Sequence, residues 1–440
     1  MTLILGWPDA TDTRMPIGFQ TTRRAVPPEP AGPVRARNAE SHWLCAAPTG
    51  SGKTRGFVIP QLLEYPGSAV VVDVKGEIAQ VTARRRREMG EVLMIDPFKC
   101  VSDGKGAFNP LAHLDSGDPD YADDILMLAA LFNNNSVRTK TDPFWDESAQ
   151  NIIAGLLAAI VHLAAKTGDG PAYLADLYDR FHASDRLYDL NVMLDLNDDL
   201  PPLAEAFIGQ YLHTNDTTRA SIGAVAAQQL RMLGSEGVKT SFGVDKGQVD
   251  RLVQGDTVTV YIVLRPDRLV SHAGFARIIL SSIMQRLMRR ASRPRHPTLF
   301  IVDEATQLGR MPSLETAATL GRGYGVRLAM LIQSLAQLED VYGDASRVFL
   351  ENMALMTMGP QNSMQASRTL ADAGFGDVSE TTVHGLDPEQ VIVKDTGQHS
   401  RILRKLDYLT DGMFEGRFDP NPAYKPAPKP GDGGQLDLFS

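Results

Sequence analysis

The segment APTGSGKT, residues 47–54, limits the folds open to this chain more than any other part of its sequence. It follows a short apolar run at residues 41–46, which we expect to form a buried strand, and it precedes residues 55–63, which we expect to begin a helix. A strand, a glycine-rich loop and a helix in this order form the usual setting of a phosphate-binding loop. The sequence therefore predicts an α/β fold with a phosphate site at this loop.

The residue types of this loop suit a nucleotide. Glycine lets backbone N–H groups turn towards a phosphate, and the helix N-terminus adds positive partial charge. Lys53 would reach the β- and γ-phosphates of ATP, and the Thr54 hydroxyl would bind Mg²⁺. The common motif begins with glycine where this chain has Ala47, so a Gly/Ser turn before a helix is the alternative. The residues expected to bind the nucleotide are Thr49, Gly50, Ser51, Gly52, Lys53 and Thr54.

A second segment supplies acids that hydrolysis would need. Residues 298–304 read TLFIVDE, an apolar run that ends in two carboxylates. This pattern predicts a buried parallel strand with Asp303 and Glu304 at its C-terminal end, where ligands of open α/β sheets bind. We expect Asp303 to hold the Mg²⁺ shell, and Glu304 to orient and polarise the attacking water. Two solvated acids that end a strand are the alternative.

Size and charge set broad limits. The chain has 440 residues, of which 43% are hydrophobic and 22% charged, which allows ordinary cores in two or three domains. The net charge of −9 argues against a surface coated in basic groups, so nucleic acid would be bound by local patches or a channel. The two cysteines form neither a disulfide framework nor a metal set, and the longest apolar run, residues 152–165, is too short to cross a bilayer. We therefore expect a cytoplasmic protein.

The pattern of apolar residues changes along the chain and divides it into parts. Strand patterns alternate with helix patterns outside residues 144–236, and inside that range the apolar spacing is helical throughout. We expect one α/β nucleotide-binding domain that an all-α domain interrupts. The expected parts are an irregular arm at 1–40, the α/β domain at 41–143 and 237–420, the inserted domain at 144–236, and a flexible Pro/Gly linker with a C-terminal peptide at 421–440.

Several stretches together resemble the type IV secretion coupling proteins, the TraG-like conjugative DNA-transfer ATPases. The matching stretches are residues 47–77, DPF at 96–98, FNPL at 108–111, FWDESAQ at 144–150, LFIVDEATQLGRM at 299–311 and residues 324–343. The resemblance implies a RecA-like P-loop NTPase with a mostly parallel central sheet and an inserted all-α domain. It also implies hexameric rings with ATP between subunits. The family usually carries N-terminal membrane helices that this sequence lacks. Two alternatives follow: a membrane-embedded secretion partner recruits the protein to the inner membrane, or the protein serves a soluble role.

Two further positions take roles from this resemblance. Arg322 matches the arginine finger that completes the site of a neighbouring subunit, with Arg310 and Arg327 as rivals and an ordinary surface arginine as the alternative. Gln333 matches the glutamine that senses the γ-phosphate, and a plain strand-end amide is the alternative. The family hallmark at residues 73–77 contains Asp73, Lys75 and Glu77, and its position suits the nucleotide site or the subunit interface. The residue types reveal no chemical role, and a structural turn with a Lys–Glu pair is the alternative.

Weaker signals leave alternatives open. The arginines at 84–87 and at 286–295 could contact phosphates or form solvated faces. The tail Gln435-Leu436-Asp437-Leu438-Phe439 resembles the peptide by which bacterial replication proteins dock on the sliding clamp, although it could also fold back on its own domain.

The favoured function is an ATP-hydrolysing coupling protein that drives DNA, or a relaxase–DNA complex, into a type IV secretion channel. One alternative is another RecA-like DNA motor, for packaging, segregation or defence. The other is a recruitment adaptor in which ATP acts only as an assembly switch.

Overall fold

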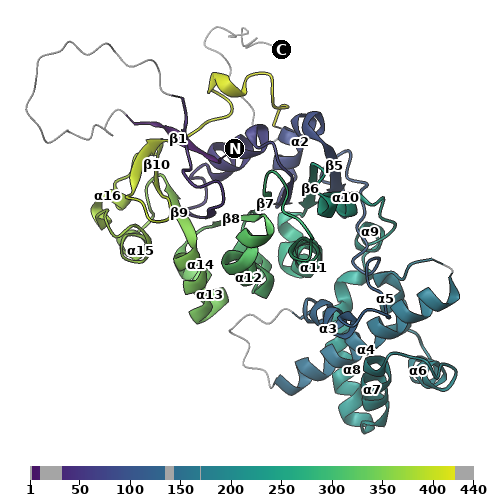
Figure 1. Ribbon diagram of the computed structural model, residues 1–440. Helices are drawn as coiled ribbons and strands as arrows, with labels where there is room; N and C mark the ends of the chain where they lie inside the picture. Colours follow the sequence, from purple (N-terminus) through teal and green to yellow (C-terminus); the bar gives the residue numbers. More distant parts are fainter. Residues whose placement is uncertain (1, 10–31, 134–142, 169, 422–440) are drawn as a thin grey trace, which may run out of the picture.

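The computed structural model describes residues 2–9, 32–133, 143–168 and 170–421. In this part of the chain an 11-stranded sheet has the order β2-β1-β11-β10-β9-β3-β8-β7-β4-β6-β5 (Figure 1). The strands are β1 Ile4–Pro8, β2 Val34–Arg35, β3 His42–Ala46, β4 Ala69–Asp73, β5 Glu91–Ile95, β6 Val258–Val263, β7 Thr298–Val302, β8 Val326–Ile332, β9 Met353–Met358, β10 Gln390–Lys394 and β11 Arg401–Arg404.

The strands from β9 to β5 pair in parallel, which confirms the predicted α/β class. Strands such as β4 and β6 are buried along their whole length, because helices cover both faces of the sheet. Alternate residues of β4 belong to different cores: Val70 packs with the helices on one face, and Val71 packs with those on the other. Since parallel strands end at the same edge, the segments after β3, β7 and β8 meet there.

Helices outside the inserted part flank this sheet. A π-helix, Thr54–Val58, follows the glycine-rich loop and continues into α1. Residues of α1 and α2 pack on one face, and residues of α11 to α13 pack on the other. These helices are α1 Ile59–Glu64, α2 Glu77–Met89, α10 Gln248–Gln254, α11 Leu269–Met288, α12 Pro312–Leu320, α13 Leu335–Tyr342, α14 Ser346–Asn352, α15 Met364–Leu370 and α16 Glu380–His384.

An antiparallel extension completes the sheet beyond β9, and the sequence analysis did not predict its strands. β10 pairs antiparallel to β9, β11 to β10, and β1, from the N-terminal arm, to β11. β9 reads MALMTM and has no β-branched run, so its sequence gives a weak strand signal. The N-terminal arm thus contributes β1 and β2 to the sheet edge.

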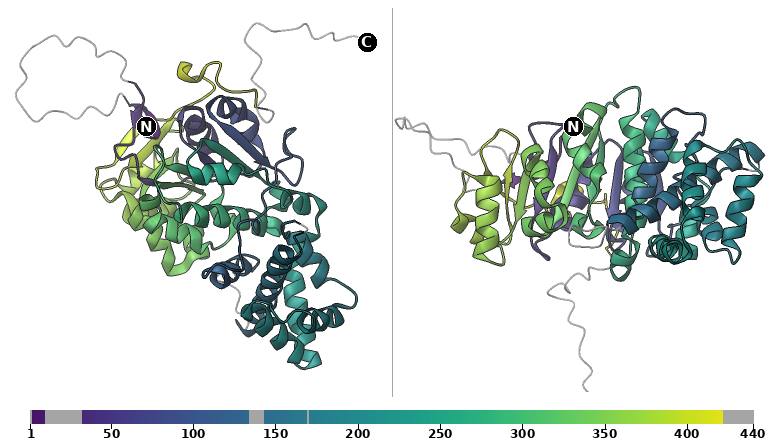
Figure 2. Two further views of the ribbon diagram at one scale, coloured as in Figure 1. Left: turned by 45° about the vertical axis from the view of Figure 1, so that its right-hand side comes forward. Right: turned by 90° about the horizontal axis from the view of Figure 1, so that it is seen from below.

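Between β5 and β6 the described chain is helical. Besides α10, the α-helices in this range are α3 Tyr121–Ala130, α4 Pro143–Thr167, α5 Leu174–Phe181, α6 Arg186–Asp195, α7 Pro202–His213, α8 Asp216–Leu230 and α9 Glu236–Ser241. Most of them form a cluster beside the sheet (Figures 1 and 2), and α4 contacts α3, α7 and α8. α5 ends at Phe181 and α6 begins at Arg186, because Ser184 and Asp185 favour a turn.

Among the described helices, α4 alone passes the length and apolarity criteria for a membrane span. It has 25 residues and extends past both ends of the apolar run 152–165. Of the most apolar 18-residue stretch of α4, 61% is buried inside the protein. In the molecule α4 is thus the central helix of the helical cluster.

Candidate nucleotide-binding site

The predicted loop and the predicted acids line one cavity of about 240 Å³. Lys53 and Thr54 reach it from the segment after β3, and Asp303 and Glu304 reach it from the segment after β7. The turn after β4, at residues 73–78, forms a further wall. The fold therefore brings together two segments that are about 250 residues apart, at the edge where ligands of parallel sheets bind.

The loop fits a phosphate group. Gly50 and Gly52 have φ angles of +80° and +88°, which favour glycine and turn the backbone N–H groups inward. Lys53 Nζ donates to Ala47 O at 2.6 Å and to Pro48 O at 3.1 Å, so the ammonium is held over the loop. Ser51 Oγ is buried without a hydrogen-bond partner in the described structure. An anion in the loop would satisfy this hydroxyl, since buried polar groups are normally paired.

Ala47, the one departure from the common motif, is fully buried. Its N–H donates to Ile332 O of β8 at 3.1 Å, so the position is packed between neighbouring strands. A methyl group fits this position without disturbing the loop.

The acid pair fits a cation. Desolvation, and then the adjacent Glu304 carboxylate, raise the pKa of Asp303 to about 6, while Lys53 opposes the shift. A nearby divalent cation would stabilise the charged form of such a carboxylate. Carboxylate, hydroxyl and phosphate oxygens are the ligands that Mg²⁺ prefers. Glu304 has φ +49° and ψ +44°, a left-handed conformation that is uncommon for a residue with a side chain. Backbone strain of this kind is concentrated at functional sites.

Gln333 contacts the acid pair directly. It follows β8, and its Nε2 donates to Glu304 Oε2 at 3.0 Å. Gln337, on the first turn of α13, donates from Nε2 to Gln333 Oε1 at 3.4 Å, and Thr306 Oγ1 donates to Gln337 Oε1 at 3.4 Å. Gln337 and Thr306 were not among the residues predicted from the sequence, although a second glutamine four residues after Gln333 is a visible signal.

In the hallmark turn at residues 73–77, Asp73 has a structural role. Asp73 is buried, its Oδ1 accepts the N–H of Gly76 at 2.9 Å, and its Oδ2 accepts the N–H of Ala79 at 2.8 Å. Burial raises the pKa of Asp73 to about 7. The carboxylate thereby caps α2, and the turn places Lys75 and Glu77 on the wall of the cavity.

We predict that Asp73→Ala lowers the free energy of unfolding by about 1–3 kcal/mol, because the N–H groups of Gly76 and Ala79 at the start of α2 lose their acceptor. The measurement is thermal and urea unfolding followed by circular dichroism. Asp103→Ala is the matched control, since Asp103 pairs with Arg87 on the surface, and its change should stay within about 0.5 kcal/mol. Equal losses for the two variants would contradict the capping role of Asp73.

Arg322 lies at the opposite edge of the sheet from the loop. Its Nη2 donates to Asn352 O at 2.6 Å. Burial, and then the charges of Arg322 and Arg327, lower the pKa of His42 to about 3, and His42 is the first residue of β3. The glycine-rich loop follows the last residue of β3, so the length of the strand separates Arg322 from the cavity of its own chain.

The two other candidates for the arginine finger, Arg327 and Arg310, bind partners within the chain. Arg327 is fully buried and donates to the backbone oxygens of Ser41 and Asn38. Arg310 pairs with Glu315 on the following helix. Burial excludes Arg327 as a group that could reach a second subunit.

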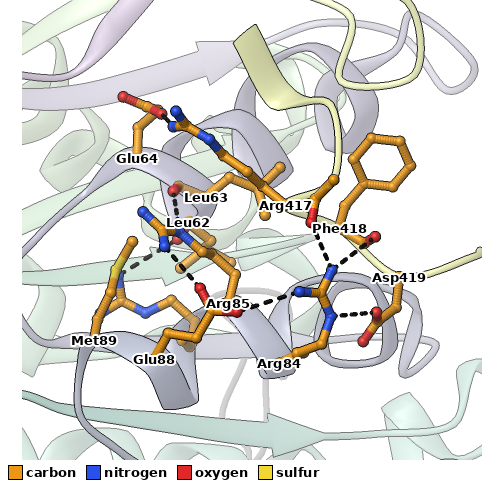
Figure 3. Close-up of polar contacts among 12 residues, drawn as sticks. Leu62, Leu63, Glu64, Arg84, Arg85, Glu88, Met89, Arg417, Phe418 and Asp419 are labelled. Carbon is orange, nitrogen blue, oxygen red and sulfur yellow. Dashed lines mark hydrogen bonds and ion pairs between the residues drawn. The ribbon is translucent and has the colours of Figure 1, made fainter. Parts of the chain in front are cut away.

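The arginine runs are largely used within the chain. Arg84 pairs with Asp419 and Glu88, Arg85 pairs with Glu88, and both lie beside the C-terminal segment in Figure 3. Arg86 is fully buried. In the second run, ion pairs join Arg286 to Asp250, Arg289 to Asp124 and Arg293 to Glu40. The tail at residues 435–439 lies outside the described residues, so its docking role stays a prediction.

The position of these groups defines the class of protein. The glycine-rich loop follows β3, the acids follow β7, and β8 lies between the two strands and is followed by Gln333. This is a RecA-like P-loop NTPase fold with an added helical part. A family model described as "Type IV secretory system Conjugative DNA transfer" matches residues 14–370. The chain belongs to this family.

Curated relatives agree with the family. The chain is 26% identical over 327 residues to the conjugal transfer protein TraG of Agrobacterium fabrum, a match that covers 73% of this chain and 49% of TraG. It is 26% identical over 438 residues to the protein VirD4 of the same species, with coverage of 88% and 62%. The chain thus spans about half the length of TraG and somewhat more of VirD4.

Solved structures share the fold. The unbound coupling protein TrwBdeltaN70 matches with a TM-score of 0.65 at 16% identity, over 85% of this chain and 86% of that chain. The plasmid coupling protein TrwB in complex with ADP and Mg²⁺ matches with a TM-score of 0.64 at 16% identity, over 84% and 86%. At these identities the likeness establishes the architecture.

Proposed function

We propose that this chain binds ATP with Mg²⁺ and hydrolyses it to drive DNA, or a relaxase–DNA complex, into a type IV secretion channel. The observation that carries the proposal is the single cavity shared by Lys53, Thr54, Asp303 and Glu304. Membership of a conjugative DNA-transfer family supports DNA as the proposed cargo. TrwB, which shares the fold, was solved with ADP and Mg²⁺ and with non-hydrolysable analogues of GTP and ATP.

The residues of the cavity divide the chemistry. Lys53 would exchange its two loop carbonyls for phosphate oxygens, and the loop N–H groups would hold the phosphates in position. Thr54 and Asp303 would hold Mg²⁺, which supplies positive charge against the phosphates when it is bound. Glu304 would orient a water molecule and accept its proton, and Gln333 would fix the Glu304 carboxylate by its hydrogen bond.

We propose that a neighbouring subunit supplies a further cation to the site. Phosphoryl transfer commonly uses an arginine to stabilise the charge of the transition state. Arg322 is too far from its own loop, so it would complete the site of a neighbouring subunit. We therefore include a homo-oligomeric ring, a hexamer by analogy with the family, in the proposed function.

The remaining parts would serve the cargo and its destination. We propose that residues 41–143 and 237–420 form the motor and that residues 144–236 form a separate all-α domain that meets cargo. The protein would act in the cytoplasm, recruited to the inner membrane by membrane-embedded secretion components.

The test is ATP hydrolysis by the purified chain with and without single- and double-stranded DNA, with its mass in solution measured in parallel. The proposal predicts a specific activity that rises with protein concentration, as subunits associate, and that DNA stimulates. Hydrolysis that is absent at every protein concentration and with both kinds of DNA would contradict it.

A further inference from the structure

A buried arginine on α11 holds the segment that follows the acid pair. Glu304 is followed directly by a short 3₁₀ helix, Ala305–Leu308. Arg277, on α11, donates from Nη1 to Leu308 O at 2.9 Å. Arg277 is 3% exposed, and burial lowers its pKa to about 10, so the guanidinium keeps its charge at neutral pH. This hydrogen bond fixes the end of the turn that begins next to Glu304.

The same guanidinium also holds the C-terminal end of α3. Nε and Nη2 of Arg277 each donate to Leu131 O at 3.3 Å, and Nη2 also donates to Asn133 O at 3.3 Å. Leu131 is the C-cap of α3, and the last carbonyls of a helix have no partner within it. A positive charge is favourable there because of the helix dipole. Arg277 therefore bridges the segment after the acids and the end of α3.

α3 is in turn attached to the central helix of the helical cluster. It packs against α4, and Tyr121 Oη donates to Ala158 O of α4 at 2.7 Å. Its first half is attached to the end of α11, because Arg289 Nη2 donates to Asp124 Oδ1 at 2.6 Å. Contiguous buried contacts thus lead from the acid-bearing segment through Arg277 and α3 to α4.

The conformation of Glu304 makes the start of this chain of contacts sensitive to a bound ligand. Its left-handed backbone, with φ +49° and ψ +44°, costs free energy and persists only while its surroundings hold it. A nucleotide with Mg²⁺ beside the Glu304 carboxylate would change those surroundings. The turn that Arg277 holds begins at the next residue, so a change at Glu304 acts on Leu308.

We propose that Arg277 is a positioning residue that couples the acid pair of the nucleotide site to α3 and the helical cluster. The inference rests on the proposed function, because it needs a nucleotide bound beside the acids. Arg277 does not line the nucleotide cavity, so it acts through the segments that it contacts. A shift of the acid-bearing segment moves Leu308, Arg277 carries it to Leu131, and α3 carries it to α4.

Hydrogen–deuterium exchange of the full chain, with and without Mg²⁺ and a non-hydrolysable ATP analogue, tests the proposal. In the wild type, the analogue should change amide exchange at least about threefold both at residues 304–309 and at residues 121–131. Arg277→Lys keeps the charge, but its single nitrogen cannot reach both sets of carbonyls. It should bind the analogue with wild-type affinity by calorimetry and keep the response at 304–309, while the response at 121–131 is lost. A merely structural role would raise exchange equally with and without the analogue.

Arg289→Gln is the matched control. Arg289 also attaches α3 to α11, but it does not contact the acid-bearing segment. Its loss should raise exchange at 121–131 equally in both states and leave the response to the analogue intact. Arg277→Gln, which removes the buried charge and reaches one carbonyl at most, is a second variant in which the response at 121–131 should be lost. Circular dichroism checks that each variant is folded, and the wild-type result decides alone if neither Arg277 variant folds.

Two results would overturn the inference and leave the proposed function standing. One is a wild-type chain that binds the analogue and responds at 304–309 alone. The other is a response at 121–131 that survives in a folded Arg277 variant. If the wild-type chain did not bind the analogue at all, the proposed function itself would fail.

Discussion

Glu304→Gln is expected to lower kcat for ATP hydrolysis at least about a hundredfold, while the affinity for ATP changes by less than about twofold. The amide keeps the shape of the side chain and its contact with Gln333 but cannot accept a proton from water. The loss should therefore fall on the chemical step. Phosphate release under saturating ATP measures kcat, and calorimetry measures binding.

Glu315→Gln is the matched control for this result. Glu315 lies on α12, outside the cavity, and pairs with Arg310. The Glu315→Gln change should therefore leave kcat unchanged. Wild-type turnover in Glu304→Gln would exclude Glu304 as the base. Full DNA transfer without hydrolysis would favour the adaptor, in which the nucleotide only switches assembly.

Arg322→Ala is expected to lower kcat about a thousandfold, the scale of a lost arginine finger, without weakening ATP binding to the isolated subunit. The reason is position: Arg322 lies at the edge of the sheet away from its own loop, so under the proposed function it would act on the site of a neighbour. Lys53→Ala should also be inactive, because its own site has lost the cation that contacts the β- and γ-phosphates.

Mixing these two inactive variants separates action in trans from action in cis. A subunit with Arg322→Ala keeps an intact cavity, and a subunit with Lys53→Ala keeps its arginine, so mixed rings should regain measurable activity. Arg310→Ala is the control and should keep full activity. If the mixture stays as inactive as its parts while its mass shows mixed assemblies, the trans role is wrong.

Much of the site could be predicted because it depends on local patterns. The strand before the loop, the glycines and Gly-Lys-Thr are contiguous, and the acids end a strongly apolar run. Parallel strands end at one edge, so the meeting of Lys53 with Asp303 followed from the fold class. The arginines at 84–87 show the limit of composition, because burial and ion pairs within the chain decide their role.

The rest depends on contacts between distant residues that no local pattern announces. Arg55 pairs with Asp407 across 352 positions, and Lys405 contacts Ser51 across 354. β9 lacks a β-branched run, so this strand gave only a weak local signal. The capping role of Asp73 needs the N–H groups of α2 in place, which the sequence DVKGE does not reveal.

The central claim is that two distant segments bind one Mg²⁺–nucleotide, and a double-mutant cycle on ATP affinity tests it most directly. With Mg²⁺ present, calorimetry should show weaker binding for Lys53→Ala and for Asp303→Asn, and a combined loss clearly smaller than the product of the single losses. With EDTA, Asp303→Asn should bind ATP as well as the wild type. Independent, multiplicative losses, or an Asp303→Asn effect that persists without Mg²⁺, would contradict the claim.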